Sequence, residues 1–332
     1  MSNALDAAGP QAAWIGQLWW LMLWLCVFVF VAVMAALGWA LCRSRRASGS
    51  ARRKLGSGPD AAKALAPDPL PAAGAERQLR LSVGGAIGLS SLLLAGLLAA
   101  SVLTDYALAH LPLHDALSIR VTAHQWWWEV VYDDPRPDHV FTTANELVIP
   151  VGRPVVITLQ ADDVIHSFWV PNLHGKKDLI PGRIAKIQLR ADREGMYVGR
   201  CAEYCGLQHA FMAYDVVAVT ADRFAAWTEH QRTSAPEPQG AAALRGRELF
   251  LTGSCMLCHA IQGTSANARR APDLTHFASR AHIAAGRLAN TPEALAKWIE
   301  DPQKIKPGVN MPSHFLPADD LAGLVAYLGT LR

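Results

Sequence analysis

Charged residues are scarce in this 332-residue sequence, and their signs nearly cancel. Asp, Glu, Lys and Arg make up 18% of the chain, and the formal net charge is only +3. A chain with so little net charge has no global field that would attract nucleic acid, so no nucleic-acid partner is expected. Hydrophobic residues reach 51%, which is high for a water-soluble protein, and the length allows two or more domains.

Cysteines are few, and no pair of them looks like a disulfide framework. Cys26 and Cys42 lie in or beside the first long apolar run, and the other four belong to two short motifs described below. Spare cysteines in even number would indicate structural disulfides in an exported protein. Their absence usually suggests the cytosol, but here it means only that the remaining cysteines are committed to other chemistry.

Charge is absent from two long apolar runs. Neither residues 14–41 nor residues 81–103 contain Asp, Glu, Lys or Arg. Each run is long enough to cross a bilayer as a helix, with room for tilt. The alternative is a buried helix of a soluble domain, which rarely needs so long a run without charge. We therefore predict two transmembrane helices in contact with lipid.

Basic residues mark the segment between the two runs. Residues 1–13 contain no Lys or Arg, whereas residues 42–80 carry Arg43, Arg45, Arg46, Arg52, Arg53, Lys54, Lys63, Arg77 and Arg80. The positive-inside rule places such a loop in the cytoplasm. We therefore expect a bacterial inner-membrane protein with both termini on the periplasmic side. The N-terminus lacks the basic region of a cleavable signal peptide, so the first helix is expected to be a retained anchor.

Residues 120–220 have the pattern of a β domain. Short runs rich in Val, Ile and aromatic residues are separated by Gly and Pro, at residues 121–132, 146–159 (broken at Pro150–Pro154), 164–170, 184–189 and 213–219. Strands at this spacing indicate an all-β sandwich or barrel. A cupredoxin-like domain is expected.

A metal-ligand motif lies between the last two of these runs. Cys201 and Cys205 are followed by His209 and Met212, and His166 lies in an earlier run. Thiolates, imidazoles and a thioether form a soft ligand set that favours copper, and two cysteines suit a binuclear centre better than a mononuclear blue-copper site. Zinc can also take two Cys and two His, but Met212 and the β pattern would then be coincidental.

A second motif follows a linker of Pro, Gly and small residues. Cys255-Met-Leu-Cys258-His259 is the attachment signature of a c-type haem. Cys255 and Cys258 are expected to hold the haem covalently, with His259 as an axial ligand. The second axial ligand is expected to be Met311, because His/Met ligation is usual in cytochromes c. His314 is its nearest rival.

Helical patterns surround the haem motif. Residues 221–243 are expected to form a helix and a linker, and residues 244–332 a haem domain with helices at 244–250, 292–300 and 318–331. This order resembles an all-α class I cytochrome c. The whole chain is thus expected to be multidomain: a transmembrane hairpin, a cupredoxin-like domain and a cytochrome c domain.

The copper motif and its surroundings resemble subunit 2 of haem–copper cytochrome c oxidases. The resemblance rests on residues 125–128 (Gln-Trp-Trp-Trp), 166–171 (His-Ser-Phe-Trp-Val-Pro), 175–183 and the loop from Cys201 to Met212. It extends from the first membrane helix to about residue 220. With the haem motif added, the chain is similar to the caa(3) type, in which a cytochrome c domain is fused to subunit 2.

The resemblance implies particular roles for residues of the loop. Cys201 and Cys205 would bridge a binuclear CuA centre, His166 and His209 would each ligate one copper, and Met212 would be a weak ligand. The backbone carbonyl of Glu203 would complete the set, and its side chain would contribute to a magnesium or manganese site shared with subunit 1. Trp126 matches the aromatic residue through which electrons reach the copper. Glu76 is expected to be an ordinary carboxylate at the membrane surface.

The resemblance also implies the function. Electrons would pass from a cytochrome c-type or other periplasmic donor through haem c to CuA, and then to subunit 1, which would reduce oxygen to water and translocate protons. Subunit 1 and a subunit 3 are the expected partners, and the chain would hold no oxygen-reducing site itself. Two alternatives stay open: a membrane-anchored electron carrier that acts alone, and the small subunit of a CuA nitric oxide reductase.

Overall fold

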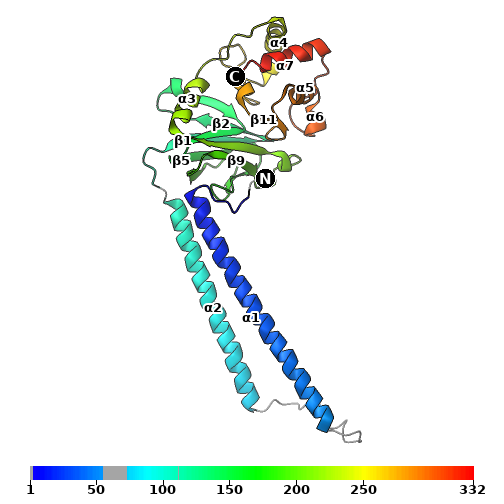
Figure 1. Cartoon of the computed structure of the whole chain (residues 1–332). Coiled ribbons are helices and arrows are strands. Elements are labelled where there is room, and N and C mark those ends of the chain that lie inside the picture. Colours follow the sequence, from blue (N-terminus) through cyan, green and yellow to red (C-terminus); the bar gives the residue numbers. More distant parts are fainter. Residues whose placement is uncertain (1–2, 55–72, 111) are drawn as a thin grey trace. The chain divides into compact units, whose positions relative to one another are not determined.

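The computed structural model describes residues 3–54, 73–110 and 112–332 (Figure 1). Two compact units are present. One comprises the N-terminal residues up to Ile15 together with Ala107–Arg332, and the other comprises Gly16–Tyr106.

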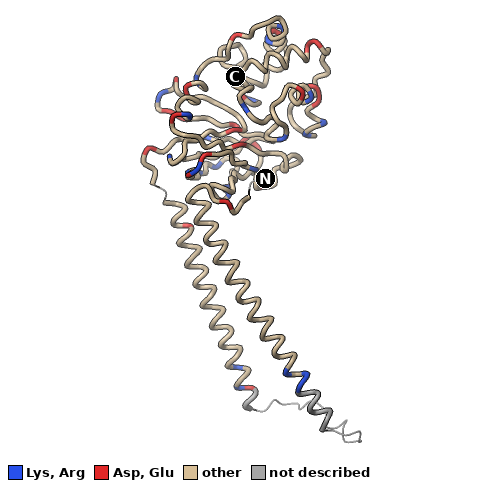
Figure 2. Tube along the Cα trace, viewed as in Figure 1, with Lys and Arg blue, Asp and Glu red and all other residues tan. Residues whose placement is uncertain are grey.

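Two long helices form the second unit and extend slightly beyond it. Helix α1 spans Pro10–Lys54 and α2 spans Ala73–Ala109, so both run past the apolar segments expected from the sequence. By length and composition each is capable of crossing a membrane. Figure 2 shows that Lys and Arg gather towards the end of α1 and the start of α2. The rest of the expected basic loop, residues 55–72, lies outside the described residues.

Two five-stranded sheets form the β domain (Figure 1). One sheet has the order β3 (Phe141–Ala144), β2 (Trp127–Tyr132), β1 (Leu117–His124), β5 (Val155–Ala161) and β8 (Ala185–Leu189). The other has the order β4 (Glu146–Pro150), β10 (Ala213–Val219), β9 (Gly195–Cys201), β6 (His166–Trp169) and β7 (Lys177–Leu179). The predicted cupredoxin-like fold is confirmed.

The core of this domain follows from strand alternation. In β2 every second residue is buried, and Trp128 is completely so. Its ring meets Phe168 and Tyr214 edge-on, at centroid distances of 6.2 Å and 4.9 Å. Such aromatic pairs tie the two sheets together beneath the cysteine-bearing loop.

Local patterns did not predict all the strands. Residues 121–132 were expected to be a single run, but they form the hairpin β1–β2, which turns at Gln125–Trp126. Strand β9 was not predicted, because Gly195 and Gly199 weaken its signal. Gly199 is required there: a Cβ atom at this position would lie 2.1 Å from the ring of Tyr214.

Short helices follow the sandwich. They are α3 (Ala221–Gln231), α4 (Ala241–Thr252), α5 (Pro292–Glu300), α6 (Pro302–Ile305) and α7 (Ala318–Leu328), with a two-stranded ribbon of β11 (His282–Ile283) and β12 (Leu288–Ala289). Helix α5 has the expected bounds. Helices α4 and α7 pack closely where Gly246 meets Gly323, since a Cβ atom on Gly246 would lie 1.9 Å from the Gly323 carbonyl oxygen. The expected all-α domain in the C-terminal part of the chain is confirmed.

Candidate metal and haem sites

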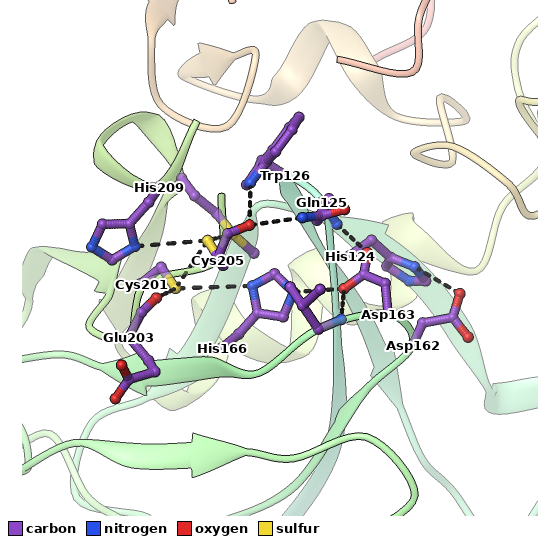
Figure 3. A network of polar contacts seen from close by, with 12 residues as sticks. His124, Gln125, Trp126, Asp162, Asp163, His166, Cys201, Glu203, Cys205 and His209 are labelled. Atoms are coloured by element: carbon purple, nitrogen blue, oxygen red, sulfur yellow. Dashed lines mark hydrogen bonds and ion pairs between the residues drawn. The ribbon is translucent and has the colours of Figure 1, made fainter. Parts of the chain in front are cut away.

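The two cysteines of the first motif lie side by side. Strand β9 ends at Cys201 and β10 begins at Ala213, so residues 202–212 form the connecting loop. Both cysteines are buried, and their Sγ atoms are 3.7 Å apart. His166, the first residue of β6, points its Nδ1 at Cys201 Sγ from 3.9 Å (Figure 3). His166, which is 35 positions before Cys201 in the sequence, thus lies beside the two cysteines.

The remaining expected ligands surround the same pair of sulfur atoms. His209 Nδ1 is 3.7 Å from Cys205 Sγ, and Met212 Sδ is 3.9 Å from it. The Sγ atom of Cys201 also lies 3.2 Å from the backbone carbonyl oxygen of Glu203. The structure therefore brings together all six donors that the sequence predicted.

A hydrogen bond between the sulfur atoms of Cys201 and Cys205 makes the two thiols unequal. Its stabilisation of the Cys201 thiolate, more than any other contact, lowers the pKa of Cys201 to about 3. The same contact, together with burial, raises the pKa of the Cys205 thiol. One thiolate therefore forms readily, and a cation at this position would favour the second.

Asp163 orients His166, a role that sequence reasoning missed. Its Oδ1 lies 2.7 Å from His166 Nε2, on the side of the ring away from the sulfur atoms (Figure 3). Burial alone would lower the pKa of His166, but the hydrogen bonds with Asp163 and Cys201 outweigh it and raise this pKa. Carboxylates in this position commonly fix metal-binding imidazoles. The only sign of this role in the sequence was that Asp163 stands three residues before His166.

The Glu203 carboxylate lies apart from the sulfur cluster. It is 3.3 Å from the Lys176 ammonium, which also pairs with Asp178, and its side chain is 42% exposed. Lys176 donates to both carboxylates, and these hydrogen bonds raise its pKa. A magnesium or manganese ion there would have to displace Lys176, so this shared site stays a prediction.

Trp126 lies directly against the loop. Its indole Nε1 donates to the Cys205 carbonyl at 2.8 Å, and Gln125 Nε2 donates to the same oxygen at 2.8 Å. Gly206 has a φ of +109°, and a Cβ atom there would lie 3.0 Å from the Trp126 ring. Glycine at this position therefore permits the close approach of the indole to Cys205.

The second motif lines a cavity of about 330 Å³. Cys255, Cys258, His259 and Met311 all face it, as does the rival ligand His314. The ring of His259 donates from Nδ1 to the Pro272 carbonyl at 2.7 Å, which leaves Nε2 for an axial bond. Burial lowers the pKa of His259 and so favours the neutral imidazole that binds iron.

Other residues of the cavity suit a haem. Its walls include the apolar side chains of Phe250, Leu274, Phe277, Ile283, Trp298, Leu324 and Leu328. Arg280 also lines it and is buried, and its Nε has no hydrogen-bond partner within the described part of the chain. Another guanidinium nitrogen of Arg280 donates to the Asp273 carbonyl at 2.6 Å. A buried guanidinium with a free Nε–H fits an anionic substituent such as a haem propionate. No sequence motif pointed to this role for Arg280.

The cavity also reaches residues beside the loop that carries Cys201 and Cys205. Trp126 and Trp127 line it together with the four haem-motif residues. Trp126 therefore belongs to both candidate sites: it lines the cavity, and its indole donates to the Cys205 carbonyl.

Comparison with known proteins agrees with this division. Residues 135–219 match the family model for the periplasmic domain of cytochrome c oxidase subunit II, and residues 243–332 match that for cytochrome c. Trp126 lies outside the first match. Cytochrome c oxidase subunit 2 of Alkalihalophilus pseudofirmus is 41% identical over 215 residues, which cover 64% of this chain and 61% of that protein.

Further relatives have the same name. Cytochrome c oxidase subunit 2 of Bacillus subtilis is 34% identical over 229 residues, covering 66% of this chain and 63% of that protein. The solved periplasmic domain of subunit II of cytochrome oxidase of Bradyrhizobium japonicum is 32% identical, with 36% of this chain and 97% of that one covered and a TM-score of 0.34. The chain spans about three fifths of the length of the two curated relatives. It therefore unites a periplasmic domain of cytochrome c oxidase subunit II with a cytochrome c domain.

Proposed function

We propose that this chain is subunit 2 of an aerobic terminal oxidase and carries electrons from a cytochrome c-type donor to the oxygen-reducing subunit. One observation supports it above the others: Trp126 lines the haem cavity and donates a hydrogen bond to Cys205. Two one-electron sites that share a residue form a relay.

Six donors are proposed to hold the copper. Cys201 and Cys205 would bridge two ions, with His166, His209, Met212 and the Glu203 carbonyl around them, because this soft donor set suits copper. In the haem cavity Cys255 and Cys258 would form the thioether bonds, and His259 and Met311 would be the axial ligands. When bound, the two groups would supply one-electron redox chemistry that connects the donor to subunit 1.

Fusion of the two domains gives a kinetic advantage. A haem on the same chain as the copper loop has a high effective concentration there, which removes one diffusional docking step. The partners would be subunits 1 and 3, lipid around α1 and α2, and a periplasmic electron donor. The proposed location is the bacterial inner membrane, with both redox domains and both termini on the periplasmic side.

Purification in mild detergent tests the proposed function. The chain is expected to purify with a large subunit that contains haem a, and the complex to consume oxygen when given reduced cytochrome c. A stable monomer without haem a would indicate a carrier that acts alone. Consumption of nitric oxide instead of oxygen would indicate a reductase subunit. Either result contradicts the oxidase proposal.

Removal of the carboxylate behind His166 should weaken copper binding. We expect Asp163→Ala to lower copper affinity by about 10- to 100-fold, because the imidazole loses the group that fixes its orientation. Competition with a copper chelator, followed by the copper absorption bands, measures this. Asp162→Ala is the matched control, since that neighbouring carboxylate pairs with His124 and not with His166. Equal affinities of the two variants would contradict the role of Asp163.

A further inference from the structure

Lys306 is a buried lysine on the segment that leads to Met311. Its exposed fraction is 1%, and its Nζ donates to the carbonyls of Trp126 at 3.1 Å and Ala284 at 3.2 Å. Burial of an ammonium group is unfavourable unless hydrogen bonds compensate, and it lowers the pKa of Lys306 to about 8. A lysine that serves only solubility would remain in water, so a more specific role is indicated.

The residues after Lys306 also contact the copper-binding loop. Gln208 Nε2 donates to the Pro307 carbonyl at 2.7 Å. Gly308 has a φ of +88°, and a Cβ atom there would lie 2.9 Å from Leu207 Cδ1. Residues 306–308, here called the bridging segment, therefore contact the loop at Leu207 and Gln208, and they also contact Trp126 in the β1–β2 turn.

The bridging segment is tied to the expected haem ligand. Gln303 of α6 donates from Nε2 to the carbonyls of Val309 at 2.7 Å and Met311 at 2.8 Å. Its Oε1 accepts from the Gly308 amide at 2.9 Å. One side chain thus holds residues 308–311 in a fixed conformation, so a displacement at Lys306 would be transmitted to Met311.

We propose that Lys306 is a positioning residue that holds the Met311 segment, and with it the haem, against Trp126 and the copper-binding loop. This inference rests on the proposed function, since it assigns Lys306 a part in the same relay. Lys306 fixes the Trp126 backbone while the Trp126 indole fixes Cys205, so two hydrogen bonds connect the haem side to a copper ligand. Electron tunnelling weakens exponentially with distance, and a small loosening here slows transfer.

The test compares Lys306→Met with Lys304→Met in the complete holo-protein. Methionine keeps the apolar stem of Lys306 and removes the ammonium. Lys304 is an exposed lysine of α6, two residues before Lys306. Two quantities are measured: hydrogen exchange of residues 205–209 and 306–311, and the rate of haem-to-copper electron transfer after flash photoreduction of the haem. We expect Lys306→Met to exchange faster in both segments and to transfer electrons about 10- to 100-fold more slowly. Lys304→Met should match the unmodified protein.

Unchanged exchange and unchanged transfer in Lys306→Met would overturn the proposal. If this variant does not fold, Gln208→Leu takes its place, because it removes the donor to Pro307. It must show faster exchange in residues 306–311 and slower transfer, and normal values would again overturn the proposal. Absence of haem-to-copper transfer in the unmodified protein would refute the proposed function, whereas the exchange comparison would still decide whether Lys306 holds the two segments together.

Discussion

Replacement of Cys205 by serine is expected to abolish the mixed-valence copper spectrum and to leave the haem spectrum intact. Cys205 Sγ lies within 4 Å of three other donors: Cys201 Sγ at 3.7 Å, His209 Nδ1 at 3.7 Å and Met212 Sδ at 3.9 Å. A serine hydroxyl is a hard donor that remains protonated at neutral pH, so it is a poor replacement for a bridging thiolate. The haem cavity contains none of these donors and should be unaffected.

Electron paramagnetic resonance, with copper and zinc counted per chain, measures this result. Cys26→Ser is the matched control, because Cys26 is exposed on α1 and belongs to neither motif. An unchanged copper signal in Cys205→Ser would refute the bridging role. Zinc in the unmodified protein, at full occupancy and without copper, would favour the zinc alternative.

The sequence predicted the sulfur cluster well because most of its members share one short loop. Spacing along residues 201–212 limits how far these side chains can separate once β9 and β10 pair, and the strands on either side are hydrogen-bonded over most of their length. His166 lies 35 positions before Cys201. The sequence offered it as a candidate ligand from an earlier run, and the resemblance to a known family gave it a role. Asp163 stands three residues before His166, but this spacing alone did not show that its carboxylate faces the His166 ring.

Residues that connect the two sites were harder to predict. Lys306 and Trp126 are 180 positions apart, and Gln208 and Pro307 are 99 apart. Periodicity and motif spacing describe local structure and contain no information on how two domains meet. Arg280 was missed for a similar reason: its role depends on an unpaired atom in a cavity, which only three-dimensional packing defines.

Strand prediction failed where side chains were small or turns unusual. Strand β9 contains two glycines, and the β1–β2 hairpin turns at Gln125–Trp126 without Gly, Pro, Asn or Asp at its centre. In contrast, α5 begins at Thr291–Pro292, where the Thr291 hydroxyl accepts from the Ala294 amide and proline occupies the first turn. Those are strong local signals, and the helix was predicted with the observed bounds.

Met311→Ala is expected to remove the methionine–iron charge-transfer band and to lower the haem reduction potential. Met311 lines the haem cavity together with His259, and Gln303 holds its backbone carbonyl. A thioether ligand raises the potential of a haem, so its loss lowers it. Every 59 mV changes the electron-transfer equilibrium about tenfold for a one-electron couple. The variant haem should therefore accept electrons from an external donor less readily.

His314→Ala separates the two candidate ligands, because His314 lines the same cavity three residues further along. It should keep the charge-transfer band and the potential, since its imidazole is not expected to bind iron. Loss of the charge-transfer band would not by itself distinguish loss of the ligand from loss of the haem, so haem content per chain is measured in parallel. A band that persists in Met311→Ala would exclude Met311 as the ligand. His314 would be the second axial ligand if two results came together: the unmodified protein lacks the band, and its spectrum of two axial histidines disappears in His314→Ala. The contacts of Gln303 with residues 308–311 would then not serve to place an iron ligand.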